Sequence, residues 1–415
     1  MAQFVVEEAK RCLQCKRPLC KEGCPVSTPF NEVVKLLLEG NIMDAGEKLF
    51  KNNPLSVVCS LVCPHEKQCQ GHCVLGRKGN PIQVGSVENY VSDYYLNFIT
   101  PEARKNTEKK VAIIGSGPAG ITIAIILASK GYDITIFEAH DKIGGVLRYG
   151  IPSFRLGKDI LEKLKDKLLS MGVKIRPNTL IGQDLTVDNL FRDGYKAIFI
   201  GTGVWKSKAL GIKGESLGHV HYAIDYLKNP EVYNLGKKVV VIGAGNVAMD
   251  VARTALRHRA SEVYIMARRG PEDVTAEKVE VEYAKIDGVR FEYYKAPVEI
   301  TEQGIKFVKT SVIKEDDSRE RLVMLEGTED IFEADTVIIA SGQGPRANIV
   351  STTNGINVTQ GGLVATDECG RTTRDGIFAS GDVVTGAKTV VEAVRLSKIV
   401  AQAIDDYVCS KYNLV

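Results

Sequence analysis

Eight of the ten cysteines in this 415-residue chain lie between residues 12 and 73, in two groups with short spacings. In each group one cysteine is followed directly by a proline, at Cys24 and at Cys63. Thiolates at such spacing are soft metal ligands, and a Cys-Pro step is typical of iron–sulfur clusters. Spacing alone therefore predicts two iron–sulfur sites. The two quartets are Cys12, Cys15, Cys20, Cys24 and Cys59, Cys63, Cys69, Cys73.

Disulfide bonds and structural zinc are the other common uses of clustered cysteines. The N-terminus has no long apolar segment after its charges, so a secretory signal is not expected and disulfides are disfavoured. Structural zinc usually takes closely spaced cysteine pairs, which the second quartet lacks. Zinc in a docking or regulatory block stays open as an alternative that a brown colour and acid-labile sulfide would exclude.

A glycine motif for dinucleotide binding, Gly115-x-Gly117-x-x-Gly120, follows an apolar strand and begins a helix. The first glycine permits a tight turn, the second lets a pyrophosphate approach the backbone, and the third lets helix and strand pack closely. Glu138 ends the next apolar strand, where a carboxylate can accept hydrogen bonds from ribose hydroxyls. Because strand, helix and acid are all in place, the motif predicts a nucleotide site and not a bare turn.

A second motif of the same form, Gly243-x-Gly245-x-x-Ala248, occurs later in the chain. Its second strand ends in Arg268 and Arg269, with no acid at the matching place. Guanidinium groups bind a 2′-phosphate, which a carboxylate would repel. The pattern favours NADPH, with NADH as the alternative if the arginines are only a solvated strand end.

These motifs need two βαβ units behind a cysteine-bearing block of short helices. We expect an α/β fold with two Rossmann-like nucleotide-binding domains, the first discontinuous, preceded by an α-helical iron–sulfur domain. The expected helices include 29–40, 42–52 and 389–407, with a linker near 100–110 and short strands over 291–330. The predicted domains are 1–107, then 108–236 with 336–415, and 237–335.

Bulk composition is ordinary for a soluble globular protein. Apolar residues make up 44%, charged residues 25%, and the net charge is +3. Such a balance gives no reason to expect nucleic acid or a membrane as partner. Without an export signal, we expect a cytoplasmic protein.

With these pieces in order, the chain resembles the small-subunit flavoprotein family of bacterial glutamate synthase. That family includes the flavoprotein subunit of NADH-dependent ferredoxin:NADP oxidoreductases and the N-terminal half of dihydropyrimidine dehydrogenase. The resemblance covers nearly the whole chain. It rests on RCLQCKRPLCKEGCP, NPLSVVCSLVCPHEKQCQGHC, IQVGSVENYVSD, GSGPAG, KIGGVLRYGIP, GAGNVAMD, ARRGPEDVTAE and GIFASGDV.

The resemblance implies two [4Fe–4S] clusters whose ligands are shared between the quartets. The fourth ligand of the second cluster is then the carboxylate of Glu88, and Cys59 is a bystander. Spacing alone instead makes Cys59 a ligand, so both assignments stay open. The implied first set is Cys12, Cys15, Cys20 and Cys73. The implied second set is Cys24, Cys63, Cys69 and Glu88.

The resemblance also implies FAD at the first glycine motif and NADPH at the second. The implied FAD residues are Gly115, Gly117, Pro118, Ala119, Gly120, Glu138, Gly144, Gly145, Leu147, Gly201, Thr202, Gly203, Gly381, Asp382, Val390 and Ala393. The implied NADPH residues are Gly243, Gly245, Asn246, Val247, Arg268 and Arg269.

Together these features predict an NAD(P)H-dependent iron–sulfur flavoprotein in which the cofactors carry the chemistry and no side chain acts as a catalytic acid, base or nucleophile. We expect it to serve a larger catalytic or electron-accepting subunit, or ferredoxin. Alternatives are the flavoprotein subunit of a ferredoxin-linked transhydrogenase or of an NAD-dependent dihydropyrimidine dehydrogenase. A thioredoxin-reductase-like enzyme would need a redox cysteine pair near its nucleotide domains, and residues 108–368 contain no cysteine.

Overall fold

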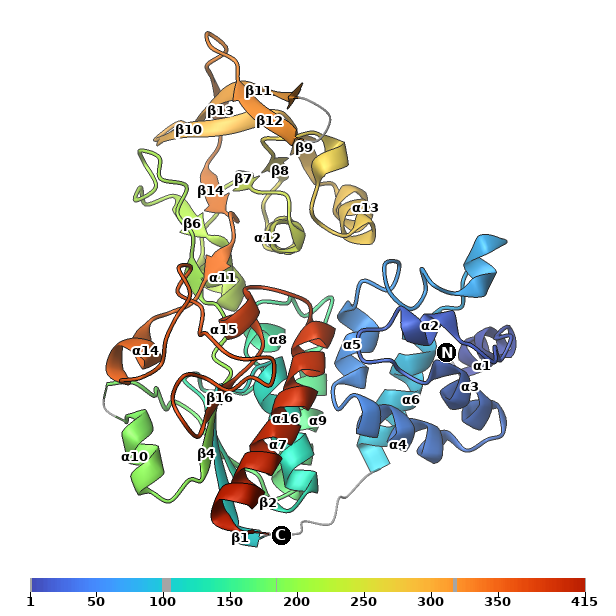
Figure 1. Ribbon diagram of the computed structural model, residues 1–415. Coiled ribbons are helices and arrows are strands. Elements are labelled where there is room, and N and C mark those ends of the chain that lie inside the picture. The colour runs from blue at the N-terminus through green and yellow to red at the C-terminus, as the bar shows by residue number, and fades with distance from the viewer. Residues whose placement is uncertain (1, 99–105, 184, 316–318, 415) are drawn as a thin grey trace. The chain divides into compact units, whose positions relative to one another are not determined.

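The computed structural model describes residues 2–98, 106–183, 185–315 and 319–414 (Figure 1). These residues form two compact units. The first comprises the described residues within 1–148, 153–204 and 344–415, and the second comprises those within 149–152 and 205–343. The expected 100–110 linker lies largely outside the described residues.

A helical block opens the first unit and contains no strand among its described residues. Its helices bury apolar faces with helical spacing, as in α3, where Phe30, Val33, Val34 and Leu37 are all buried. Cys12, Cys20 and Cys73 pack against the same core. The elements are α1 (Ala2–Lys10), α2 (Leu19–Glu22), α3 (Phe30–Leu38), α4 (Ile42–Asn52), α5 (Ser56–Val62), η1 (Val74–Arg77) and α6 (Val84–Phe98).

A parallel sheet with strand order β16-β4-β1-β2-β3 forms the centre of the rest of this unit. The helices α7 and α16 pack against each other beside it (Figure 1). Both β2 and β4 are buried along their whole length, as expected for a sheet covered on two faces. The strands are β1 (Asn106–Ile114), β2 (Tyr132–Phe137), β3 (Lys174–Arg176), β4 (Ala197–Ile200) and β16 (Ile377–Ala379). The helices are α7 (Pro118–Ser129), α8 (Val146–Tyr149), α9 (Lys158–Ser170), α10 (Val187–Arg192), α14 (Asn348–Thr352), α15 (Asp382–Thr385) and α16 (Val390–Tyr412).

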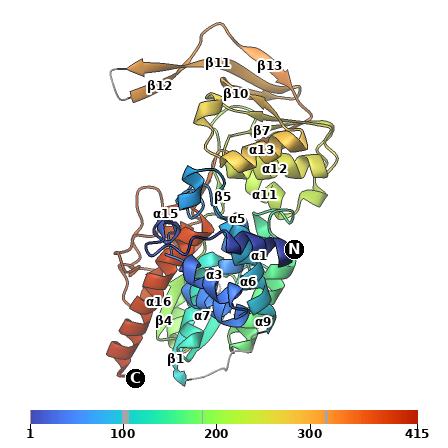
Figure 2. The same cartoon turned by 90° about the vertical axis from the view of Figure 1, so that its right-hand side faces the viewer.

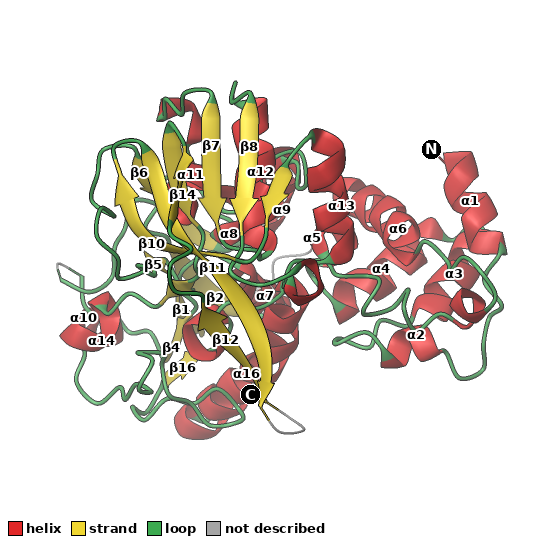
Figure 3. Cartoon of the chain, turned by 90° about the horizontal axis from the view of Figure 1, so that it is seen from above, coloured by secondary structure: helices red, strands yellow, loops and turns green. Residues whose placement is uncertain are grey.

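The second unit has its own parallel sheet, in the order β6-β14-β7-β8-β9 (Figure 3). An antiparallel layer of β10, β11, β12 and β13 accompanies it (Figure 2). The strands are β5 (Lys206–Ser207), β6 (Val220–Tyr222), β7 (Lys238–Ile242), β8 (Glu262–Met266), β9 (Arg290–Glu292), β10 (Lys295–Thr301), β11 (Gly304–Glu315), β12 (Arg319–Met324), β13 (Asp330–Glu333), β14 (Thr336–Ile339) and β15 (Gln343–Gly344). The helices are α11 (Ala223–Lys228), η2 (Pro230–Val232), α12 (Asn246–Arg257), η3 (Pro271–Asp273) and α13 (Lys278–Asp287).

The expected α/β class with a helical N-terminal block is confirmed. The boundaries between the two units differ from the predicted domain boundaries. The sequence placed residues 205–236 and the strand at 336–339 in the first nucleotide-binding domain. In the structure β6 and β14 pair with each other, and β14 also pairs with β7. Their backbone hydrogen bonds extend the second sheet, so these segments belong to the second unit. Within the described residues, no helix combines the length and apolarity needed to cross a bilayer.

Candidate cofactor sites

The loop after β1 has the geometry that a bound pyrophosphate needs. Gly115 adopts φ +97°, and a Cβ there would lie 2.6 Å from the carbonyl oxygen of Gly201. A Cβ on Gly120 would collide with the carbonyl oxygen of Gly115. At Gly117, the N-cap residue of α7, a Cβ would meet no described atom within 4 Å. The loop is therefore closely packed at its first and third glycines and open at the second, where the helix N-terminus can receive phosphate.

Further predicted FAD residues meet at the same edge of the first sheet. Glu138 follows β2, Gly201-Thr202-Gly203 follows β4, and Gly381-Asp382 follows β16. Because the strands are parallel, their carboxyl ends share one edge, and ligands bind outside that edge in open α/β sheets. A Cβ on Gly381 would lie 3.1 Å from the Cβ of Ala119 and 3.9 Å from that of Ala393, so three predicted segments are neighbours.

The Gly144–Leu147 segment lies directly over the first glycine loop. The backbone N–H of Gly144 donates to the carbonyl oxygen of Ser116 at 3.0 Å. A Cβ on Gly145 would lie 2.8 Å from the Cα of Gly117. The Arg148 side chain donates to the carbonyl oxygen of Ile143 at 2.7 Å and holds this turn. Leu147 is fully buried beneath it.

Glu138 is buried and already has protein donors. One carboxylate oxygen accepts from the N–H and hydroxyl of Ser116, and the other from the N–H and ring Nδ1 of His140. Burial raises the pKa of Glu138, but the hydrogen bonds from His140 and Ser116 outweigh it, so the net pKa is below its usual value. Sequence reasoning missed these protein partners of Glu138, which lie at both carboxylate oxygens.

Asp382, at the start of α15, is a second acid at this edge. Burial raises its pKa to about 6, against a hydrogen bond from the Lys388 N–H at 3.2 Å. The two acids therefore differ: Glu138 favours its ionised form, whereas Asp382 favours its neutral form below about pH 6. Val390 begins α16 shortly after it.

The second glycine loop repeats the backbone geometry with more open surroundings. Gly243 adopts φ +130°, and a Cβ there would lie 2.5 Å from the carbonyl oxygen of Ala340. A Cβ on Gly245 would meet only the Thr275 hydroxyl, at 3.6 Å. The Asn246 side chain is exposed, although its oxygen accepts from the Glu277 N–H at 2.9 Å. Val247 packs partly against the core of this unit.

Arg268 and Arg269 follow β8 at the carboxyl edge of the second sheet, as predicted. The Arg268 side chain is exposed, and no carboxylate of the described residues pairs with it. Arg269 is half-buried, and its guanidinium lies 3.5 Å from Asp273. One arginine is thus available to an incoming phosphate, while the other already has an acidic neighbour.

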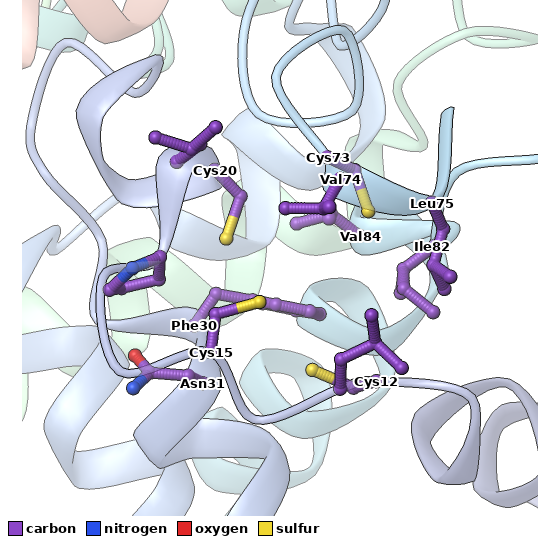
Figure 4. A pocket seen from close by; sticks show the side chains of 13 residues that line it. Cys12, Cys15, Cys20, Phe30, Asn31, Cys73, Val74, Leu75, Ile82 and Val84 are labelled. Carbon is purple, nitrogen blue, oxygen red and sulfur yellow. The ribbon is translucent and has the colours of Figure 1, made fainter. Parts of the chain in front are cut away.

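The first implied cluster set comes together in space. Cys12, Cys15, Cys20 and Cys73 all line one pocket, although Cys73 is far from the others in sequence. Figure 4 shows the sulfur atoms of these cysteines around one space, with apolar side chains such as Phe30 and Ile82 beside them. Burial raises the pKa of Cys20 to about 11, with further contributions from Cys12 and Cys73. Four thiols in one apolar pocket fit a four-iron cluster.

The second implied set includes a buried carboxylate. Glu88 on α6 is 6% exposed, and burial alone raises its pKa to about 8. Burial also raises the pKa of Cys69, and the charges of Glu88 and Cys24 raise it further. The pKa of Cys63 is raised by a hydrogen bond with Cys59, by burial, and by the charges of Cys59, Glu88 and Cys69. The donor set therefore fits the shared ligation, but Cys59 lies in it too, and its exclusion stays a prediction.

Direct coordination of a single ion is a different question. Within the described part of the chain, no three His, Cys, Asp or Glu side chains lie close enough together to hold one metal ion.

His65, which sequence reasoning gave no role, contacts Cys69 through Nδ1 at 3.4 Å and the Ser60 carbonyl oxygen through Nε2 at 3.0 Å. The sequence could have indicated this contact, because His65 stands four residues before Cys69.

Comparison with known proteins places both halves of the chain. Residues 109–396 match the family described as pyridine nucleotide-disulphide oxidoreductase. The chain belongs to this family. Residues 1–98 match the 4Fe–4S domain described as dihydropyrimidine dehydrogenase domain II. The family name mentions a disulphide, but residues 108–368 of this chain contain no cysteine to form one.

Among curated proteins, the glutamate synthase (NADPH) small chain of Halomonas elongata is 36% identical over 98% of this chain and 91% of its own length. The Escherichia coli protein of that name is 34% identical over 96% and 90%. The NADP(+)-dependent formate dehydrogenase subunit beta of Moorella thermoacetica is 34% identical over 94% of this chain and 59% of its own length.

Among solved structures, Mycobacterium tuberculosis FprA in complex with NADPH matches with a TM-score of 0.62 at 17% identity, over 74% of this chain and 86% of its own. Thioredoxin reductase of T. acidophilum matches with a TM-score of 0.55 at 22% identity, over 73% and 99%. These likenesses show the fold. The curated relatives and the family matches confirm the glutamate synthase small-chain resemblance. The chain is an NAD(P)H-dependent flavin oxidoreductase with an N-terminal 4Fe–4S domain.

Proposed function

We propose that this chain takes hydride from NADPH onto FAD and passes single electrons through two [4Fe–4S] clusters to a partner subunit, as an electron-input subunit of the glutamate synthase small-chain type. The observation that carries the proposal is the pocket that gathers Cys12, Cys15, Cys20 and Cys73 in the unit that also holds the first glycine loop. When bound, the flavin converts a two-electron donor into one-electron steps, and the clusters carry those electrons singly.

The residues of the first unit would hold FAD and both clusters. Gly117 leaves space for a pyrophosphate at the start of α7, while the Gly144–Leu147 turn covers the loop. The helical block and the first nucleotide-binding domain share this unit, and Lys163 of α9 pairs with Asp93 of α6 at 2.6 Å. Such contacts support electron transfer between fixed carriers.

In the second unit, the open loop at Gly245 and the exposed Arg268 would receive NADPH. The positive charge of Arg268 favours a 2′-phosphate, so NADPH is the proposed donor and NADH the alternative. Relatives with this cofactor in their names support the choice.

The proposed acceptor is a larger catalytic or electron-accepting subunit, or ferredoxin, in the cytoplasm. The names of the glutamate synthase small chains and the formate dehydrogenase subunit beta support a role within a larger enzyme. Partners of relatives differ, so transhydrogenation with ferredoxin and pyrimidine reduction are kept as alternative end uses of the same electron input.

Anaerobic analysis of the purified chain tests the proposal. We expect about eight irons per FAD, from two four-iron clusters. NADPH should bleach the flavin absorbance first and the cluster absorbance afterwards. A count near four irons would contradict the second cluster, and a flavin that NADH reduces faster than NADPH at low concentration would contradict the donor.

A further inference from the structure

A hydrogen-bonded chain links the C-terminal helix of the flavin-binding domain to Cys24 in the helical block. Lys398 on α16 donates from Nζ to the carbonyl oxygen of Asn52 at 2.7 Å and to Asn52 Oδ1 at 3.1 Å. Asn52 ends α4 and donates from Nδ2 to the Val26 carbonyl oxygen at 3.1 Å and to the Thr28 hydroxyl at 3.4 Å. The Thr28 hydroxyl lies 3.4 Å from the Cys24 sulfur.

The donors of this chain all point the same way. An ammonium and an amide NH₂ can only donate, so Lys398 directs its protons to Asn52, and Asn52 directs its own toward Thr28. A metal-ligating cysteine is a thiolate and accepts, which leaves the Thr28 hydroxyl to donate to it. This series of hydrogen bonds therefore presents the positive end of aligned dipoles to Cys24. The Lys398 ammonium lies at its other end.

The residues of this hydrogen-bonded series are buried or half-buried. Thr28 is 6% exposed, and Asn52 and Lys398 are half-buried. Lys398 stands eight residues after Val390 on the same helix, which is about 12 Å along the axis from the predicted FAD contact. Burial lowers the pKa of Lys398, while the charge of Cys24 raises it, so the lysine and the sulfur are within electrostatic reach.

We propose that Lys398, Asn52 and Thr28 form a relay that raises the reduction potential of the cluster held by Cys24 and so favours electron transfer from the flavin to it. The proposal rests on the proposed function for the existence of that cluster. Hydrogen bonds to ligand sulfurs and nearby positive charge stabilise the more negative, reduced cluster. Aligned hydrogen bonds in a low-dielectric interior also polarise one another. The three residues are positioning residues, because they act through Cys24.

Redox titration followed by electron paramagnetic resonance of the intact, cluster-loaded chain tests the relay. Thr28→Val removes the donor to Cys24, Thr28→Ser keeps it, and Lys398→Met removes the ammonium while keeping the apolar stem. We expect Thr28→Val and Lys398→Met each to shift the flavin–cluster equilibrium about tenfold against one cluster, which is about 59 mV for one electron. The other cluster and the Thr28→Ser variant should keep wild-type potentials.

Two controls separate a relay from a mere packing contact. Lys163→Gln breaks the Lys163–Asp93 pair, which joins α9 to α6 without reaching a cysteine, and should leave both potentials unchanged. The reduction potential of the cluster should be little lower in the Thr28→Val/Lys398→Met double variant than in either single variant, because both changes interrupt one path. Full additivity would instead mean that Lys398 acts only through space and would overturn the relay.

The outcomes also separate this proposal from the proposed function. A normal iron and FAD content with unaltered potentials in Thr28→Val overturns the relay and leaves the proposed function standing. A wild-type protein with only one four-iron cluster, retained in Cys24→Ala, overturns both.

Discussion

The two glycine loops of this chain share one backbone design but differ in what surrounds them. The first is enclosed: Gly145 approaches Gly117, Gly381 approaches Ala119, and the buried Glu138 follows the neighbouring strand. The second is more exposed to solvent: the side chains of both Asn246 and Arg268 are exposed. An enclosed site suits a cofactor that stays bound, and an open one suits a nucleotide that must leave after each turnover.

The two cysteine sets show a similar contrast. The first consists of four thiols lining one pocket, and the second includes a buried carboxylate without a cationic partner in the described residues. A carboxylate ligand gives a cluster another potential than four thiolates would. Duplicated motifs can therefore perform different tasks because of the side chains around them.

The largest expected effect comes from Gly120→Ala, which tests the enclosure of the first loop. The added methyl would collide with the carbonyl oxygen of Gly115, and overpacking of this kind costs about 1–3 kcal/mol. We expect FAD content to fall to a small fraction of wild type, measured by absorbance after gel filtration. The matched change in the second loop, Ala248→Gly, should keep FAD. Equal FAD content in both variants would remove the contrast between the loops.

Glu88→Ala tests the contrast between the cysteine sets. Without its carboxylate the second cluster loses a ligand, so iron should fall from about eight to about four per chain while NADPH still reduces the flavin. Cys59→Ala is the matched control and should keep about eight irons. The reverse result, in which Cys59→Ala loses the cluster and Glu88→Ala does not, would restore the quartets given by spacing.

The Arg268→Ala/Arg269→Ala double variant tests the open site. Loss of one effective charge-assisted contact to a 2′-phosphate, worth about 1.5–3 kcal/mol, should raise the KM for NADPH by about 10–100-fold. The KM for NADH should change little, and steady-state kinetics with both nucleotides would measure the ratio. Arg269 already has Asp273 beside it, so Arg268→Ala alone should give most of the effect. An equal rise in the KM for both nucleotides would contradict a 2′-phosphate site.

The smallest expected effect concerns Asp382, the acid of the enclosed site with a pKa raised to about 6. Since the folded state holds this proton more tightly than the unfolded state, stability falls as pH rises from about 4 to about 6 and stays lower above that. Asp382→Asn keeps the acceptor for the Lys388 N–H and removes the charge. The FAD-free variant should be more stable than wild type at pH 7.5, and the difference should vanish near pH 4 in thermal unfolding. An equal gain at both pH values would rule out this ionisation as the cause.

The sequence by itself determined the fold class and the kinds of cofactor site. Glycine spacing reports a backbone requirement that is local, so Gly115, Gly117 and Gly243 could be assigned without a structure. The cysteine types and their Cys-Pro steps likewise indicated iron–sulfur chemistry, and the strand pattern with Glu138 indicated the first nucleotide site.

The tertiary structure alone decided which distant residues are neighbours. Spacing grouped Cys73 with Cys69, whereas the family resemblance implied a set with Cys12. The fold brings Cys73 into the pocket of Cys12, because helix packing and not sequence distance sets the approach of loops. Strand pairing placed β6 and β14 in the second sheet, where the linear pattern had assigned them to the first. The path from Lys398 to Cys24 joins side chains that are hundreds of residues apart, and no local pattern reports such contacts.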